Sequence, residues 1–196
     1  MPLIDPLSPE HDPALQDLAR FFHGTLGFVP NSVLTMQHRP AIAVAFIALN
    51  KAVMHNEGRL SSEQKRLVAL VSSATSGCRY CQAHTALAAQ RFGASGERLA
   101  AISSFRESPL FTDAEKVAFE YALAASSVPN AVDADLHTRL KEHWDAGEIV
   151  ELTAVIALFG FLNRWNDSMA TTLEPQAASS AVELLSGTDW NRGKHL

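Results

Sequence analysis

Residues 60–93 decide the fold class of this chain, and they read LSSEQKRLVALVSSATSGCRYCQAHTALAAQRFG. Apolar residues recur in this stretch at spacings of three and four, which places them on one face of a helix. Ser61 and Gln64 form a capping-box pattern that opens a first helix. Gly77 interrupts it, and a second helix begins at Cys78 and runs to the glycine at the end of the stretch. The stretch therefore predicts two consecutive helices, with Cys78 at the N-terminus of the second.

The rest of the chain continues this pattern, with repeated alanine and leucine and without a convincing alternation of apolar and polar residues. Its 196 residues, 47% of them hydrophobic, are enough to build one substantial core. We therefore predict an all-α fold in a single domain. The helices are expected at residues 13–26, 33–55, 61–75, 78–92, 112–126, 133–142 and 148–171, with one more short helix after residue 175.

Turn signals divide the chain into three parts. An N-terminal helix and turn are expected over 1–30, the main helical domain with both cysteines over 31–174, and a C-terminal tail with a short helix over 175–196. The sequence VPNAV at 128–132 echoes VPNSV at 29–33, which weakly suggests an internal helical duplication. Two matches this short also arise from shared turn chemistry, and this origin is favoured.

The charged residues are scattered along the chain, which carries a formal net charge of -5. No basic stripe is present to meet a phosphate backbone, so no nucleic-acid partner is expected. The longest apolar run, residues 41–49, is well short of the roughly 20 residues that a membrane span requires, so no membrane partner is expected. Residues 1–7 contain an acid and two prolines where a secretory signal needs basic residues, which favours a cytoplasmic protein. The sequence has no glycine-rich phosphate loop, and we predict no cofactor.

The chain has two cysteines, Cys78 and Cys81, separated by two residues. In a reducing compartment such a pair is better explained by chemistry or metal binding than by a structural cross-link. Unpaired N–H groups at a helix N-terminus favour the thiolate, which is the reactive form. Cys81 lies about 60° around the helix from Cys78, so the two sulfur atoms can meet and form a disulfide. His84 follows one turn after Cys81 on nearly the same side and is the best local acid or base.

Two further roles for the cysteine pair stay open: half of a zinc site, or two small apolar side chains buried in the core. A structural zinc site usually needs four ligands. The sequence offers neither a second cysteine pair nor a histidine spaced as a ligand with His84. Zinc binding therefore needs distant ligands or a second subunit, and we place no metal in the predicted site.

Residues 76–86 read SGCRYCQAHTA, and this segment resembles the core of the alkylhydroperoxidase D / carboxymuconolactone decarboxylase family, in its peroxidase-related branch. The resemblance is detailed over 60–93 and looser over 31–174, where it includes GFLNRWN at 160–166. It implies an all-helical AhpD-like fold and a homo-oligomer. It also implies a CxxC disulfide that reduces a hydroperoxide substrate and is restored by a thiol reductant, either a protein or a small molecule.

Two positions depart from the family pattern. Peroxidase members of the family have a glutamate twelve residues before the first cysteine, where this chain has Arg66. Glu63 lies one turn earlier and is the candidate to replace that glutamate, although its place in a capping segment also suits the helix dipole. The family histidine falls where this chain has Thr85, and His84 comes one residue earlier. Arg66 or Arg79 is able to stabilise a thiolate by charge, but a solvated surface position is favoured for both.

Asn163 and Asn166 lie on one face of a very apolar predicted helix. Buried amides need hydrogen-bond partners, so these side chains either line the site or cross-link helices, and the second use is favoured. The apolar stripes of the helices at 33–55 and 148–171 are typical of core or subunit interface.

Together, the residues and the resemblance predict thiol-dependent peroxide reduction with an antioxidant role. The predicted catalytic residues are Cys78, Cys81, His84 and Glu63. Which cysteine attacks the peroxide stays open, because the helix terminus favours ionisation of Cys78 while the deeper sulfur beside His84 also suits the attack. Two alternatives remain: a lyase of the decarboxylase branch, and a non-enzymatic helical oligomer that binds a ligand or senses redox state.

Overall fold

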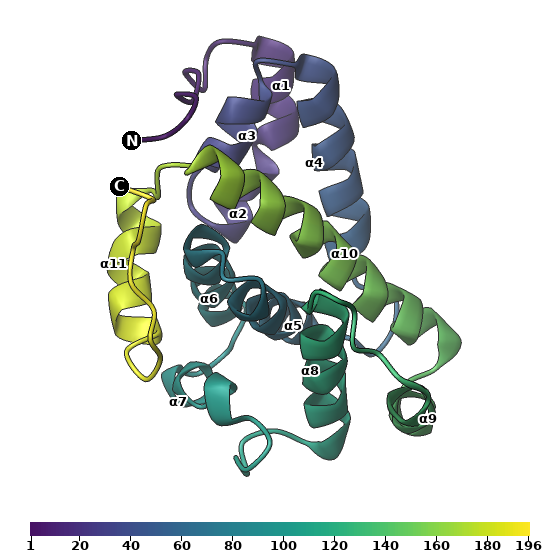
Figure 1. The fold of residues 1–196 in the computed structure, drawn as a ribbon. Helices are drawn as coiled ribbons and strands as arrows, with labels where there is room; N and C mark the ends of the chain where they lie inside the picture. The colour runs from purple at the N-terminus through teal and green to yellow at the C-terminus, as the bar shows by residue number, and fades with distance from the viewer.

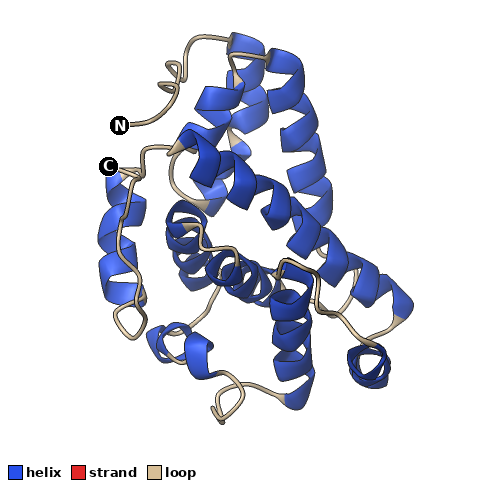
Figure 2. Cartoon of the chain, in the orientation of Figure 1, coloured by secondary structure: helices blue, strands red, loops and turns tan.

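The all-α prediction is confirmed by the computed structural model, which describes all 196 residues except the side chains of Gln16 and Leu18. The described residues form helices joined by turns, without a β-strand (Figure 2). The helices are α1 (Pro13–Ala19), α2 (Phe21–Thr25), α3 (Asn31–Met36), α4 (Pro40–Met54), α5 (Ser62–Thr75), α6 (Arg79–Arg91), α7 (Gly96–Ala100), the short 3-10 helix η1 (Ile102–Ser104), α8 (Asp113–Ser126), α9 (Ala134–His143), α10 (Ala146–Met169) and α11 (Pro175–Leu184).

Helices α5, α6 and α10 form the centre of the molecule. The helix α10 runs diagonally across Figure 1 and packs against α4, α5, α6 and α8. The helix α11 returns from the end of α10 and packs along α6, while α9 and α8 lie together at the opposite end. The helix α6, which carries Cys81 and begins at Cys78, is therefore enclosed by α5, α10 and α11.

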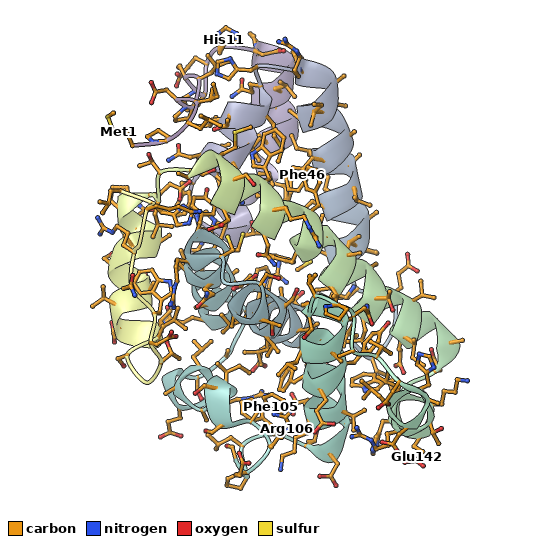
Figure 3. All side chains as sticks on the ribbon, viewed as in Figure 1. Met1, His11, Phe46, Phe105, Arg106 and Glu142 are labelled. Carbon is orange, nitrogen blue, oxygen red and sulfur yellow. The ribbon has the colours of Figure 1, made fainter. Side chains whose placement is uncertain are left out.

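The central helix α10 has 24 residues and a mean hydropathy of 1.5 over its most apolar stretch, so by length and composition alone it is able to cross a membrane. It has the packing of a core helix, however. Its residues Leu152 and Val155 are completely buried. On α4, Phe46 points toward α10 (Figure 3), and its ring stacks with Phe161 at a centroid distance of 6.0 Å. The apolarity of α10 is thus used, at least in part, to build the interior of this fold.

The two helix starts that were predicted from capping boxes are confirmed. Ser61 caps α5 with Gln64, and Thr112 caps α8 with Glu115; both reciprocal hydrogen bonds are present in each box. Each box satisfies backbone N–H groups that have no partner within the helix. Gly93, just after α6, has a φ of +112°, a conformation that side chains with a Cβ rarely adopt. This glycine ends the cysteine-bearing helix as the sequence predicts.

Two predicted helices are each divided in the structure. The segment 13–26 forms α1 and α2, which meet at Arg20, and the segment 33–55 forms α3 and α4. The second division has a clear cause, because Pro40 lacks the N–H that a continuous helix needs and forces the preceding residue out of the helical region. Arg39 accordingly has a φ of −138° and a ψ of 86°, and α4 begins at the proline.

Candidate functional site

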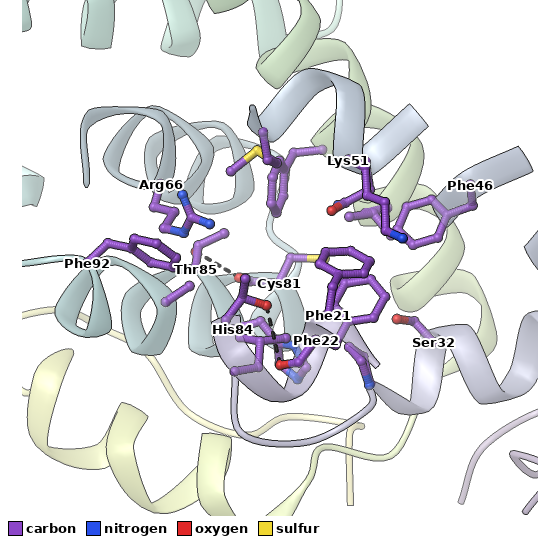
Figure 4. Close-up of a pocket in the computed structure, with 18 of the residues that line it drawn as sticks. Phe21, Phe22, Ser32, Phe46, Lys51, Arg66, Cys81, His84, Thr85 and Phe92 are labelled. Atoms are coloured by element: carbon purple, nitrogen blue, oxygen red, sulfur yellow. Dashed lines mark hydrogen bonds between the residues drawn. The ribbon is translucent and has the colours of Figure 1, made fainter. Parts of the chain in front are cut away.

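A cavity of about 430 Å³ lies along α6 (Figure 4). Its walls come from α2, α3, α4, α5, α6 and α10, and they are mostly apolar. Five phenylalanine rings and one tyrosine ring line it: Phe21, Phe22, Phe46, Phe92, Phe159 and Tyr80. A mainly apolar cavity of this size with a few polar groups is typical of a site for a small organic molecule.

The two cysteines have different positions relative to this cavity. Cys81 is among the lining residues, whereas Cys78 is completely buried behind it as the N-cap of α6. The Cys81 backbone N–H donates a hydrogen bond to the Cys78 sulfur over 3.3 Å. Both cysteines are free thiols, one helical turn apart. In the described part of the chain, no group of three or more His, Cys, Asp or Glu side chains is placed to hold a metal ion.

Asn166 reaches the Cys81 sulfur from α10. Its side-chain N–H donates to this sulfur over 3.4 Å, so the amide links α10 to α6, as the favoured prediction has it, and also lines the site. Burial raises the pKa of the Cys81 thiol well above its ordinary value, and the adjacent Cys78 adds to this increase. The hydrogen bond from Asn166 acts in the opposite direction but is the weaker effect. Cys81 therefore needs a base to become a thiolate.

His84 lines the cavity, and a buried carboxylate orients its imidazole. The His84 ring nitrogen Nε2 lies 2.6 Å from one carboxylate oxygen of Glu174. The other oxygen accepts hydrogen bonds from the Tyr80 hydroxyl over 2.8 Å and from the Asn31 backbone N–H over 2.5 Å. Burial favours protonation of Glu174, but the charge and hydrogen bond of His84, with the Asn31 N–H, hold the pKa of this carboxyl below its ordinary value. Glu174 is thus an anion that fixes the imidazole.

Two aromatic rings also hold the imidazole in place. The Tyr80 ring stacks on His84 at a centroid distance of 4.2 Å, and Phe28 meets it edge-on at 5.5 Å. The neighbouring Thr85 also lines the cavity, but its hydroxyl donates to the Cys81 carbonyl oxygen over 2.8 Å. Of these two adjacent positions, His84 is therefore the one that offers a titratable group to the cavity.

Glu63, the other predicted acid, lies outside the cavity. Its carboxylate pairs with Arg98 at 2.5 Å, and the same guanidinium also pairs with Glu115. The structure therefore does not bring Glu63 together with the cysteines, and its position gives no support to a catalytic role. Arg79 is also directed away from the site, toward Asp189 at 3.0 Å.

Arg66 occupies the cavity wall, and the favoured prediction of a solvated surface position is wrong. Only 5% of this residue is exposed, and its guanidinium lies over the Phe92 ring, 3.6 Å from the centroid. One N–H donates to the Ser62 carbonyl oxygen over 2.8 Å. Burial lowers the pKa of Arg66 to about 10, so it remains a cation at neutral pH.

Sequence reasoning missed Glu174 and underestimated Asn166. Glu174 lies 90 positions after His84, and Asn166 lies 85 positions after Cys81. Neither distance matches a local motif, so only the tertiary packing of α10 and α11 against α6 brings these groups to the site. The available signal was the buried amide on an apolar helix, which needs a polar partner.

Comparison with protein families and curated proteins gives a consistent result. The sequence matches the model of the carboxymuconolactone decarboxylase family over residues 40–124. It is 42% identical over 92 residues to the uncharacterized protein YnjA of Escherichia coli (strain K12), a match that covers 47% of this chain and 50% of that protein. It is 25% identical over 112 residues to the uncharacterized protein YdfG of Bacillus subtilis (strain 168), covering 56% and 74%. The chain thus aligns with about half the length of YnjA.

Solved structures extend the likeness over nearly the whole chain. The debrominase Bmp8 superposes with a TM-score of 0.85 and 32% identity, covering 93% of this chain and 97% of that one. A cysteine-to-alanine variant of Bmp8 has been solved in complex with 2,3,4-tribromopyrrole. The AhpD core of a peroxidase-related protein from Ralstonia eutropha JMP134 has a TM-score of 0.76 at 20% identity, covering 90% and 91%, and shows the fold. The AhpD-like fold prediction is confirmed, and the chain belongs to the carboxymuconolactone decarboxylase family.

Proposed function

We propose that this protein is an oxidoreductase that reduces a small organic hydroperoxide through a reversible Cys78–Cys81 disulfide. The observation that carries the proposal is the position of the two sulfurs: Cys81 borders the apolar cavity, and Cys78 lies one turn behind it. The overall reaction converts one hydroperoxide and two thiols into an alcohol, water and a disulfide. Two electrons pass from the thiols to the O–O bond.

The surroundings of Cys81 suit it to attack the peroxide. Its thiolate attacks one peroxide oxygen, the O–O bond breaks, and a sulfenic acid forms on Cys81 while the alcohol leaves. The Cys78 sulfur then attacks the sulfenic sulfur and water is released. His84 lines the same cavity one turn along α6, so it is placed to take the thiol proton and to return it to the leaving oxygen. Asn166 donates to the sulfur and stabilises its charged form.

Turnover also requires a thiol donor, a protein or a small molecule, that reduces the disulfide. With such a donor the protein acts as an antioxidant enzyme, and we place this activity in the cytoplasm and, as the family resemblance implies, in a homo-oligomer. The alternative reaction, a lyase reaction of the decarboxylase branch, needs no disulfide and consumes no thiol. Thiol consumption therefore separates the two classes of reaction.

A second candidate function is the reductive removal of halogen from an aromatic ring. It is favoured by the likeness to the debrominase Bmp8 at 32% identity and by the aromatic rings that line the cavity that Cys81 borders. In this reaction an aryl bromide and two thiols give the unsubstituted ring, bromide, a proton and a disulfide. The electron balance is the same as for a peroxide, so one dithiol centre is able to serve either reaction.

Thiol titration with purified, reduced protein tests both candidates. We expect cumene hydroperoxide to remove two thiols per chain and to yield one cumyl alcohol. We expect Cys81→Ser to lose this reaction completely, whereas Cys78→Ser reacts once and accumulates a sulfenic acid that dimedone labels. A parallel assay with 2,3,4-tribromopyrrole measures released bromide.

Each outcome of this assay has a defined meaning. If both single-serine variants reduce the hydroperoxide as fast as the parent, peroxidase function through this pair is excluded. Bromide release without peroxide reduction favours the second candidate. Loss of no thiol with either reagent favours a lyase or a binding protein.

A further inference from the structure

The cavity wall contains a buried cation that the proposed redox chemistry does not use. Arg66 is more than nine-tenths buried and lines the cavity. Among the described side chains, no carboxylate forms an ion pair with it. A guanidinium has five N–H donors, and the hydrogen bond that Arg66 makes goes to the Ser62 carbonyl oxygen. Burying a charged group without an opposite charge is costly, so this arginine indicates a site for an anion.

The charge of the whole cavity lining supports this conclusion. Arg66 and Lys51 are the arginine and the lysine of the lining, and the described lining contains neither aspartate nor glutamate. Lys51 holds its ammonium 5.0 Å from the centre of the Phe21 ring. Glu174 is close by, but its carboxylate is already engaged by His84, Tyr80 and the Asn31 N–H. The cavity is thus an apolar space with positive charge at its wall.

The arrangement along α6 separates the cation from the reactive sulfur. Cys81, Thr85, Ala88 and Phe92 line the cavity at successive turns of α6 and just beyond its end. The Arg66 guanidinium is stacked on Phe92, whose backbone lies three turns, or about 16 Å along the helix axis, beyond that of Cys81. Figure 4 shows Arg66 and Phe92 on one side of the cavity, with Thr85 between them and Cys81. A molecule that contacts both Arg66 and Cys81 therefore carries an anionic group at one end and its reacting group at the other.

We propose that Arg66 binds the carboxylate of the substrate, whose apolar or aromatic body then extends past Thr85 and presents its reacting group to Cys81. A carboxylate suits this site, because one guanidinium edge matches its two oxygens and the rest of the cavity wall is mostly apolar. The substrate class is therefore an apolar organic acid. The reacting end of this assignment rests on the proposed function, but the carboxylate subsite itself does not.

Binding of an unreactive acid and its matched amide tests the subsite separately from any redox reaction. The probes are 3-phenylpropanoate and 3-phenylpropanamide, measured by isothermal titration calorimetry with the reduced protein. We expect the parent to prefer the acid by about ten- to a hundredfold, the range for a hydrogen bond to a charged group. Arg66→Gln should remove this preference, because it weakens binding of the acid and leaves binding of the amide unchanged. Arg79→Gln, a matched arginine outside the cavity, should keep it.

The outcomes decide the subsite whether or not the protein proves to be a reductase. Equal binding of acid and amide by the parent, or absence of binding by both, overturns the proposal, as does an unchanged preference in Arg66→Gln. If Arg66→Gln does not fold, Arg66→Lys serves instead. This variant retains the charge but loses the two-point geometry, so we expect a reduced preference for the acid, and an unchanged one overturns the proposal. Thiol titration with peroxide remains an independent readout of the proposed function.

Discussion

At the scale of single residues, two cysteines one turn apart have different surroundings. Cys81 borders the cavity and receives the Asn166 N–H, whereas Cys78 is fully buried and receives a backbone N–H. The spacing of the pair and its place at a helix start could be predicted from the sequence. The assignment of Cys81 as the attacking sulfur could not, because it depends on which side of α6 the cavity lies.

Because burial raises the pKa of Cys81, the proposed reaction needs a base at neutral pH, and His84 is the base that we propose. We expect His84→Gln to lower the rate of thiol oxidation by hydroperoxide at pH 7 by about a hundredfold, the usual range for loss of a positioned base. The deficit should become smaller as pH rises, because solvent then removes the thiol proton without help from the imidazole. Stopped-flow measurements between pH 6 and 9 provide both rate profiles.

A matched control for this variant is His38→Gln, because His38 is exposed and its ring contacts the Asp5 carbonyl oxygen, away from the cavity. We expect the rate profile of His38→Gln to coincide with that of the parent. A His84→Gln deficit that stays constant across the pH range contradicts the role of His84 as a base and points to a positional effect on the cavity.

At the scale of helices, local chemistry made the central part of the fold predictable. The capping boxes at Ser61 and Thr112 and the glycine at Gly93 are signals within a few residues, and each one marks a helix end in the structure. The apolar character of segment 33–55 predicts a single long helix. Pro40 divides it, since proline removes a backbone donor whatever the surrounding apolar pattern. Helix boundaries in this region can therefore be predicted from capping boxes, glycines and prolines when every residue is considered.

Gly93 allows α6 to end in a conformation with positive φ. Replacing this glycine should show how much that conformation contributes to stability. We expect Gly93→Ala to lower the free energy of unfolding by about 1–2 kcal/mol, because an added Cβ disfavours its φ of +112°. Crowding is a minor factor, since the nearest atom to such a Cβ is a Glu63 carboxylate oxygen at 3.9 Å. Urea denaturation followed by circular dichroism measures the change.

Gly24→Ala is the matched control for this substitution. Gly24 lies inside α2, and an added Cβ there meets no atom within 4 Å. Alanine in a helix is favoured over glycine by roughly 0.5–1 kcal/mol, so this variant should be as stable as the parent or more so. Equal destabilisation by both substitutions argues against a conformational role for Gly93.

At the scale of the whole molecule, Glu174 connects segments that are far apart in the sequence. It is the N-cap residue of α11, and its carboxylate binds Asn31 at the start of α3 as well as Tyr80 and His84 on α6. This contact could not be predicted from spacing, because it exists only after the C-terminal helix has packed along α6. The same carboxylate therefore serves the fold and the orientation of the cavity histidine.

Replacement of Glu174 by glutamine keeps the size of the side chain but removes its charge, so its effect on stability should depend on pH. We expect Glu174→Gln to lower the free energy of unfolding at pH 7 by about 1–3 kcal/mol, because a buried donor loses its acceptor. The pKa of Glu174 in the folded protein is held below its ordinary value of 4.5. The stabilisation by the anion is therefore complete above pH 4.5 and is lost as pH falls through the lowered value.

The free energies of unfolding of the parent and Glu174→Gln should accordingly converge in acid, which urea denaturation at pH 7, 5, 4 and 3 measures. Asp189→Asn is the control, because it removes a carboxylate from the exposed pair with Arg79, and exposed pairs contribute little to stability. A Glu174→Gln deficit that is the same at every pH assigns the effect to side-chain shape instead of charge. In that case His84 is held by packing between Tyr80 and Phe28, and its orientation does not depend on the anion.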